Sequence, residues 1–364
     1  MANTPLTPRP GIMDIAPYVP GEAKIAGQAE PAQLAANENA LGPSAAAIAA
    51  YNAAAQSLHR YPDGGAVELT KAIGEVHGLD AKRIVCGAGS DEILALLGRG
   101  YVGPGDETLY SEHGFLMYPI ITKSLGATPL KAPETDLTAN VDALLAAVTP
   151  KTRVVFLANP NNPTGTMLPA GELKRLRNGL DDNILLVIDA AYAEYVDDPA
   201  YSDGRELVDA GSNVVMTRTF SKIYGLAALR IGWCYAPTSI VDVLHRIRGP
   251  FNVTATAIAA GAAAVRDREH VQRSRNHNTV ERARLADRLA QLGLKGPQSH
   301  GNFLLIRFES PEMAEGALKS MNAVGVIPRR VAGYGLPECL RITVGTASEN
   351  DRVVDALADF TGAK

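Results

Sequence analysis

The chain carries three polar segments within or at the ends of apolar runs, at positions where apolar side chains would pack more favourably. Lys222 lies between hydroxyl residues and an apolar run in "TFSKIYG", and Asp189 ends the apolar run "ILLVID". The third segment, "NPNNPTG" at residues 159–165, closes another apolar run. An ammonium group is costly to bury unless it is paired or loses its proton, and a lysine without its proton is an amine available for covalent chemistry.

Each segment alone has an ordinary structural explanation, as a surface lysine, a helix-capping aspartate or a proline-rich loop. The three segments, however, come in order along the chain, and each ends a predicted strand or closely follows one. Ligands of open α/β sheets bind beyond the carboxyl ends of the strands, where such segments meet. Their joint occurrence therefore indicates one chemical site.

A glycine turn, "GAGSDE" at residues 87–92, stands between a predicted strand and a predicted helix for which Ser90 is the expected N-cap. The turn does not match the dinucleotide-binding pattern, because Glu92 stands where the third glycine belongs. Free backbone N–H groups at the start of a helix bind anions. The turn therefore predicts an anion site, with an ordinary tight turn as the alternative.

The spacing of the other reactive residues favours neither a metal site nor a disulfide. The seven histidines show no HExxH pattern and no close pairing. Cys86, Cys234 and Cys339 are far apart and form no CxxC pair, which is typical of inert thiols in a reducing compartment. The sequence also lacks a P-loop and the GxSxG elbow of serine hydrolases.

The elements that must position these segments alternate between short apolar strands and helical patterns. Such alternation predicts an α/β protein with a mostly parallel sheet covered by helices on both faces. The predicted strands of this sheet are residues 83–87, 107–110, 153–159, 184–189, 214–219 and 231–236, and predicted helices include residues 90–101 and 170–180.

The 364 residues are long for a single core and predict a division into parts. Residues 1–41 are rich in Pro, Gly and Ala and are expected to form an arm that contributes to the small domain and to dimer contacts. We expect a large domain over residues 42–253 and a small α+β domain over 254–364. The small domain would begin with a long helical stretch to about residue 292 and contain strands at 302–308 and 339–345.

Composition and charge exclude some classes of function. With 46% hydrophobic and 20% charged residues and a formal net charge of -4, the chain reads as an ordinary globular protein without a basic surface for nucleic acid. The N-terminus has no apolar signal-peptide segment, and the longest apolar runs are too short and alanine-rich to span a membrane. We therefore expect a cytoplasmic protein.

Three central motifs together, "NPNNPTG", "IDAAYAEY" and "RTFSKIYGLAALRIGW", resemble those of the fold type I aminotransferases that use pyridoxal 5′-phosphate (PLP). The resemblance covers nearly the whole chain. The flanking segments "RPGIMDIAPYVPG", "NEN", "HRYPDG", "GAGSDEI" and "GYGLPECLRITVGT" are similar to the histidinol-phosphate branch of this family, which also contains aromatic aminotransferases. A departure is Ala40, where the family commonly has proline.

The resemblance implies roles for individual residues. Lys222 would form a Schiff base with PLP and shuttle the α-proton of the substrate, and Asp189 would hold a proton on the ring nitrogen. Tyr192, the third catalytic residue, would hydrogen-bond the ring's phenolic oxygen together with Asn162. Phe115 would stack on the ring, where the family commonly has tyrosine. The remaining cofactor contacts within the subunit would come from Gly89, Ser90, Asp91, Thr219, Ser221 and Arg230, most of them at the phosphate.

The substrate and the second subunit would be contacted by residues far from Lys222. The resemblance places Arg341, with Asn162, at the substrate carboxylate, whose place the phosphate of histidinol phosphate would take. Arg329, with Arg330 as an alternative, would add positive charge for this phosphate. Tyr18 would add a hydroxyl contact to the same phosphate. Tyr61 would reach the cofactor phosphate of the other subunit, which implies a homodimer with shared active sites.

The activity implied by the resemblance is transamination between L-histidinol phosphate and 2-oxoglutarate, giving imidazole acetol phosphate and L-glutamate in histidine biosynthesis. An aromatic amino-acid aminotransferase for phenylalanine or tyrosine is the close alternative. A PLP-dependent decarboxylase of a phosphorylated amino acid is a further alternative on the same fold. A PLP-sensing transcription regulator is rejected, because the chain has no room for a DNA-binding domain before the arm.

Overall fold

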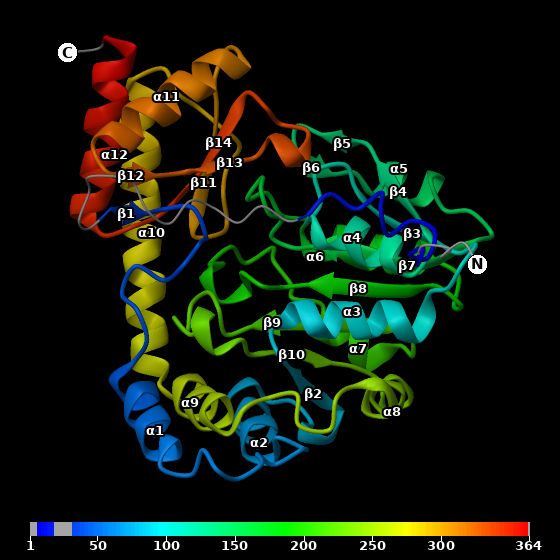
Figure 1. Cartoon of the computed structure of the whole chain (residues 1–364). Coiled ribbons are helices and arrows are strands. Elements are labelled where there is room, and N and C mark those ends of the chain that lie inside the picture. Colours follow the sequence, from blue (N-terminus) through cyan, green and yellow to red (C-terminus); the bar gives the residue numbers. More distant parts are fainter. Residues whose placement is uncertain (1–5, 18–30, 363–364) are drawn as a thin grey trace, which may run out of the picture.

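The computed structural model describes residues 6–17 and 31–362. Its centre is a seven-stranded sheet with strand order β2-β10-β9-β8-β7-β3-β4 (Figure 1). β10 is antiparallel to both neighbours, and all other pairs are parallel. The strands are β2 (Ile84–Gly87), β3 (Glu107–Ser111), β4 (Thr128–Ala132), β7 (Thr152–Ala158), β8 (Leu185–Asp189), β9 (Val214–Thr219) and β10 (Gly232–Tyr235).

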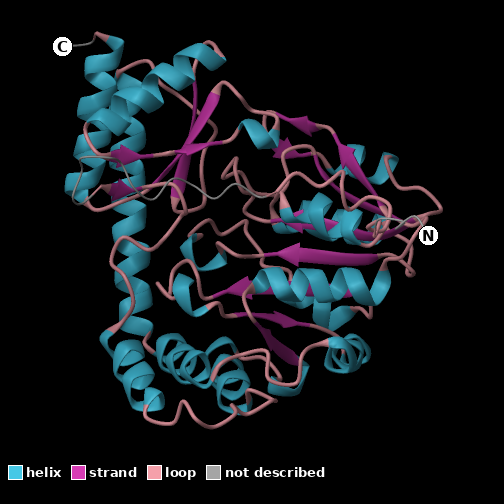
Figure 2. Ribbon diagram, viewed as in Figure 1, coloured by secondary structure: helices cyan, strands magenta, loops and turns pink. Residues whose placement is uncertain are grey.

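The sheet separates two hydrophobic cores, and this explains why its strands are apolar at successive positions. Val154 and Phe156 of β7 point into the core formed with α3 (Ser90–Tyr101), α4 (Met117–Ser124) and α8 (Thr238–Ile247). Val155 and Leu157 point into the other core. Helices therefore lie on both faces of the sheet (Figure 2). Those of the second face are α1 (Ala45–Ala55), α2 (Val67–His77), α5 (Val141–Ala146), α6 (Ala170–Gly179), α7 (Arg205–Ala210) and α9 (Ala255–Arg266).

A smaller α+β body surrounds a third core. Its sheet has the order β11-β14-β13 and is antiparallel throughout. Leu285 of α10, Leu318 of α11 and Leu357 of α12 pack against its strands. The long helix α10 runs from this body down to α1 and α9 (Figure 1). The elements are α10 (Arg268–Gln291), β11 (Phe303–Arg307), α11 (Pro311–Ala323), β13 (Arg329–Arg330), β14 (Cys339–Thr343) and α12 (Ala347–Thr361).

Several short elements complete the fold. β1 (Ala32–Gln33) pairs in parallel with β12 (Val326–Ile327). The chain therefore adds a strand to the smaller body before it continues into α1 of the larger one. β5 (Glu134–Thr135) and β6 (Thr138–Ala139) pair antiparallel. Four 3-10 helices complete the described chain: η1 (Ala81–Arg83), η2 (Ala193–Tyr195), η3 (Ala227–Leu229) and η4 (Ala332–Tyr334).

The predicted α/β class with a mostly parallel sheet between helices is confirmed, whereas one local expectation is wrong. Ser90 is the first residue of α3 and not its N-cap; the cap is Gly89, which has a positive φ of 87°. The predicted helical stretch from residue 253 to about 292 is confirmed and consists of two helices, α9 and α10, because the Asp267 side chain accepts a hydrogen bond from the His270 N–H and starts α10 anew. The division into arm, large domain and small domain stays a prediction. None of the helices in the described part of the chain is long and apolar enough to cross a membrane.

Candidate active site

A cavity of about 260 Å³ lies at the carboxyl edge of the parallel strands. Its wall contains Ala158, Asp189 and Thr219, which are the last residues of the adjacent strands β7, β8 and β9. This is the edge at which open α/β sheets bind ligands. Most of the predicted cofactor residues line this cavity together: Ser90, Asp91, Phe115, Asn162, Asp189, Tyr192, Thr219, Ser221, Lys222 and Arg230.

Lys222 follows β9 and presents its amine to the cavity. Nζ donates a hydrogen bond of 2.8 Å to the carbonyl oxygen of Ala36 and lies 5.9 Å from the centre of the Tyr192 ring. Burial, together with the positive charge of Arg341, lowers the pKa of Lys222 to about 8. Near neutral pH, the unprotonated fraction of Lys222 is therefore larger than that of an ordinary lysine.

Asp189 is a buried carboxylic acid beneath the same cavity, with 5% of its surface exposed. The hydroxyl groups of Tyr118 and Thr217 donate hydrogen bonds to its two oxygens at 3.1 and 3.2 Å. Burial raises the pKa of Asp189 to about 6, and the two donated hydrogen bonds act in the opposite direction. At neutral pH the group is still mainly the carboxylate, and a carboxylate held in this way can keep a proton on a neighbouring ring nitrogen.

A candidate anion site lies where α3 begins. The guanidinium of Arg230 donates to Ser221 Oγ at 3.1 Å and to Asp91 Oδ2 at 3.3 Å. A Cβ at Gly89 would lie 2.5 Å from Arg230 Nη2, so this glycine lets the guanidinium close over the helix start. Together with the first N–H groups of α3, these groups suit a phosphate.

The donor set of the cavity fits PLP. It offers an amine at Lys222, a buried carboxyl group at Asp189, an aromatic ring at Phe115 and an anion site at the start of α3. These groups match the aldehyde, the ring nitrogen, the ring face and the phosphate of that cofactor.

Arg341 joins the smaller body to this cavity. Its guanidinium donates to Asn162 Oδ1 and to the carbonyl oxygen of Ala35, both at 2.5 Å. Arg329 of β13 is directly opposite Arg341 of β14 in the antiparallel pair, so both side chains project from the same face of the sheet.

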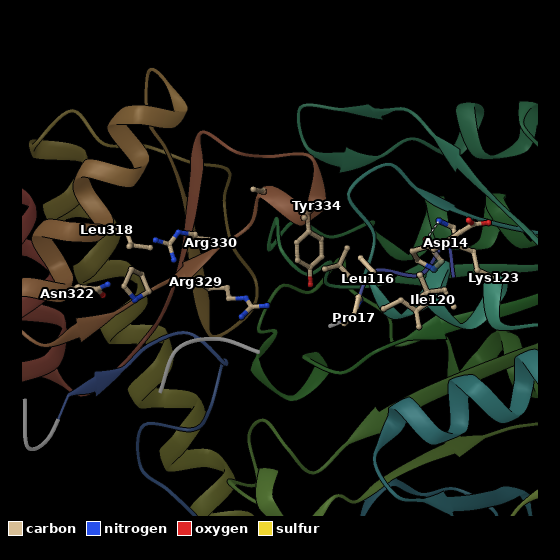
Figure 3. A pocket seen from close by; sticks show the side chains of 16 residues that line it. Asp14, Pro17, Leu116, Ile120, Lys123, Leu318, Asn322, Arg329, Arg330 and Tyr334 are labelled. Carbon is tan, nitrogen blue, oxygen red and sulfur yellow. Dashed lines mark hydrogen bonds between the residues drawn. The ribbon is translucent and has the colours of Figure 1, made fainter. Parts of the chain in front are cut away.

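Arg329 lines a second, mostly apolar cavity of about 580 Å³ between the two bodies. Figure 3 shows Arg329 and Tyr334 extending from the smaller body toward Leu116 and Ile120 of the larger one. Leu116 follows Phe115, which lines the first cavity, so the two cavities are neighbours. The side chain of Arg330, the alternative to Arg329, donates two hydrogen bonds of 3.0 Å to Glu315.

Besides Gly89, Arg329 and Arg341, which lie next to the first cavity without lining it, two predicted residues are away from it or cannot be placed. Tyr61 is 83% exposed and stacks on Phe251 with 4.7 Å between ring centres. Tyr18 falls outside the described residues.

The sequence reasoning missed other residues around the cavity. Tyr118 lies within an apolar helix, and its spacing gave no sign that it would meet Asp189. Asn37 is 1% exposed, adopts a positive φ of 55° and donates to the Tyr192 hydroxyl oxygen at 2.9 Å. The asparagines of "NEN" in an otherwise apolar arm were the available signal, since asparagine tolerates the left-handed conformation. Ala36 and Glu38 also line the cavity.

Comparisons with known proteins agree with this geometry. A family model for aminotransferase class I and II matches residues 30–357. The histidinol-phosphate aminotransferase of Paramagnetospirillum magneticum is 58% identical, with 98% of this chain and 99% of that protein covered. That of Dinoroseobacter shibae is 55% identical over 98% of both chains. The crystal structure of histidinol-phosphate aminotransferase from Sinorhizobium meliloti in complex with pyridoxal-5′-phosphate superposes with a TM-score of 0.88 at 28% identity, covering 97% of each chain.

Proposed function

The chain belongs to the class I and II aminotransferases, and from this membership we propose that it transfers the amino group of L-histidinol phosphate to 2-oxoglutarate. The products are imidazole acetol phosphate and L-glutamate, in a step of histidine biosynthesis. The observation that carries the reaction type is the meeting of Lys222, Asp189 and the anion site of α3 in one cavity. The nearly full-length relatives favour this substrate over an aromatic amino acid and over decarboxylation.

When bound, PLP supplies an aldehyde that captures amines and a ring that accepts electrons. Lys222 would hold it through the side-chain amine and would move the α-proton of the substrate, for which its lowered pKa suits it. Asp189 would keep a proton on the ring nitrogen. Tyr192 and Asn162 would donate hydrogen bonds to the ring oxygen, and Phe115 would cover the ring face. Ser90, Asp91, Thr219, Ser221 and Arg230 would line the phosphate end, where Gly89 lets Arg230 approach the start of α3.

Arg341 binds the anionic group of both substrates, and Arg329 assists it with the phosphate. Arg341 lies beside the cofactor cavity through Asn162 and receives the α-carboxylate of glutamate. Histidinol phosphate has a phosphate in place of the carboxylate, and the neighbouring Arg329 adds the positive charge that a dianion requires. The apolar wall beyond Arg329 suits an imidazole ring.

The test compares three arginine variants with histidinol phosphate and with glutamate as the amino donor. Arg329→Gln is expected to lower kcat/KM for histidinol phosphate at least about tenfold more than for glutamate, because a charge-assisted hydrogen bond contributes roughly 1.5–3 kcal/mol. Arg341→Gln lowers both, and Arg330→Gln is the matched control, whose side chain pairs with Glu315. Equal losses for both donors in Arg329→Gln would refute the assignment of Arg329 to the phosphate.

We also propose a homodimer in which Tyr61 completes the partner's site. Tyr61, Phe251, Leu58 and Val67 are large apolar side chains exposed on the described chain near the α1–α2 end. Exposed patches of this kind mark protein interfaces. Mixing inactive Lys222→Ala and Tyr61→Ala subunits tests the idea, because a mixed dimer contains one site with both native residues. Recovered activity is expected, and its absence in a verified mixed dimer would refute sharing. The free, buried state of all three cysteines supports a cytoplasmic location.

A further inference from the structure

Asn37 connects the smaller body to the cofactor cavity. Its backbone N–H donates to Thr343 Oγ1 of β14 at 2.9 Å, and Asn302 Nδ2 donates to its carbonyl oxygen at 3.1 Å. Its side-chain amide reaches the other way and donates to the hydroxyl oxygen of Tyr192 at 2.9 Å. The residue therefore contacts β14, the segment before β11 and the turn after β8 at the same time.

The hydrogen bonds around Asn37 fix the direction of its amide. Thr343 Oγ1 accepts the backbone N–H of Asn37, and its own hydrogen is donated to Asn37 Oδ1 at 3.1 Å. With Oδ1 occupied in this way, Nδ2 faces Tyr192. A phenol has one hydrogen to donate, and a phenol oxygen that already accepts from Asn37 keeps this hydrogen for another acceptor. Tyr192 lines the cavity, where that acceptor would lie.

We propose that Asn37 is a positioning residue that directs the hydroxyl hydrogen of Tyr192 toward the ring oxygen of the cofactor. This inference rests on the proposed function, because it requires PLP in the cavity. It also joins the orientation of Tyr192 to β14, the strand that carries Arg341 two residues before Thr343. A shift of the smaller body would therefore move the hydrogen-bond partner of the Tyr192 hydroxyl as well as Arg341.

The surroundings of Tyr192 support its role as a donor. Burial raises its pKa to about 12, so the phenol keeps its hydrogen at neutral pH. The charged and titratable groups that face it are Arg341 and Tyr334 of the smaller body, Asp189 before its own turn and Lys222 after β9. A hydrogen bond from the Tyr192 hydroxyl would stabilise the form of the cofactor with more negative charge on the ring oxygen, which is the form favoured at higher pH. Losing this hydrogen bond therefore raises the pH midpoint at which the visible absorbance of the bound cofactor changes.

The experiment measures this pH midpoint in the cofactor-loaded protein. Asn37→Gly removes the amide and still accepts the positive φ, and Tyr192→Phe removes the phenol. Tyr192→Phe is expected to raise the midpoint. Asn37→Gly is expected to raise it by on the order of half a pH unit, the share of one neutral hydrogen bond. The double variant should equal Tyr192→Phe, because the two residues act through one hydrogen bond.

Further variants separate positioning from general loosening of the arm. Asn37→Asp is nearly isosteric, accepts the phenol hydrogen and should raise the midpoint more than Asn37→Gly does. Thr343→Val removes the hydroxyl that orients the amide and should act in the same direction. Asn39→Ala is the control from the same segment, since its side chain donates to Ile223 O and Ser274 Oγ; it should lower thermal stability and leave the midpoint unchanged.

The failure of this inference and of the proposed function are distinguishable. A wild-type midpoint in Asn37→Gly and Asn37→Asp, or an Asn37→Gly shift that persists in the Tyr192→Phe background, would overturn the role of Asn37 alone. Absence of visible absorbance in the wild-type protein after incubation with PLP would overturn the proposed function and the inference with it.

Discussion

Replacing Arg218 with methionine should destabilise the protein strongly, although Arg218 does not line the cavity. It lies in β9 immediately before Thr219, and only 4% of its surface is exposed. Its guanidinium pairs with Glu194 of η2 at 2.8 Å and with Asp203. Because Glu194 follows Tyr192 by two residues, these ion pairs hold the segment of Lys222 against the segment of Tyr192.

The size of the effect follows from what Arg218→Met leaves behind. The side chains of Glu194 and Asp203 are 5% and 6% exposed, and without Arg218 their charges lose a buried partner. Breaking a buried ion pair from one side costs roughly 3–5 kcal/mol. Arg266→Met is the matched control, because Arg266 also pairs with two carboxylates, Glu68 and Glu75, but at the surface. Exposed pairs of this kind contribute up to about 1 kcal/mol.

Urea unfolding of the two variants and the wild-type protein, followed by circular dichroism, measures the difference. The charge of Arg218 holds the pKa of Asp203 below its ordinary value against the effect of burial. In Arg218→Met the Asp203 carboxyl group can be protonated more easily, so the deficit in stability should be largest at pH 7–8 and shrink toward pH 5. A loss no greater than that of Arg266→Met, or a deficit that grows as the pH falls, would refute the reasoning.

Three further predictions concern the cofactor site and its support. With a pKa of about 8, about one in ten Lys222 side chains is unprotonated at pH 7, whereas a lysine with a pKa of 10.5 would be unprotonated in only about one in three thousand. The rate of PLP uptake by the apoprotein should therefore rise about tenfold per pH unit below pH 8 and level off above it. A rate that keeps rising steeply to pH 10 would contradict the lowered pKa. Gly89→Ala should weaken PLP binding about tenfold or more in an equilibrium titration, because the residue has a positive φ and its Cβ would meet Arg230; unchanged affinity would show that this close approach is dispensable. Burial lowers the pKa of His77 to about 3, so above pH 3 the folded protein does not bind a proton there, whereas the unfolded chain does below pH 6.5. The wild-type protein should therefore lose up to about 2 kcal/mol of stability at this residue between pH 7 and 5. His77→Gln should not show this loss, and an acid sensitivity equal to that of the wild-type protein would be evidence against the reasoning.

The central sheet could be predicted from sequence because its strands are apolar on both faces and end in polar segments. The predicted strand at residues 214–219 has the bounds of β9, and Asp189 and Lys222 lie together as the order of the segments indicated. β4 was not predicted, since "TPLKA" is partly exposed and lacks a continuous apolar run. The short strands β1, β12 and β13 are two residues each, too few for a periodic pattern.

Residues that reach the site through tertiary contacts were beyond sequence reasoning. Tyr118 occupies a position in α4 that reads as core, and only the fold brings its hydroxyl to Asp189. The amide of Asn37 is oriented by Thr343, which is 306 residues away in sequence. The arrangement of Arg329 opposite Arg341 likewise depends on the register of β13 with β14, which no local pattern specifies.

The most direct test of the proposed function compares kcat/KM for histidinol phosphate, histidine, phenylalanine and tyrosine, each with 2-oxoglutarate as the amino acceptor. Histidinol phosphate should exceed the other three by at least about tenfold, because it alone presents a dianionic phosphate to Arg329 and Arg341. Equal or higher values for phenylalanine or tyrosine would contradict the proposed substrate and leave an aromatic aminotransferase in its place.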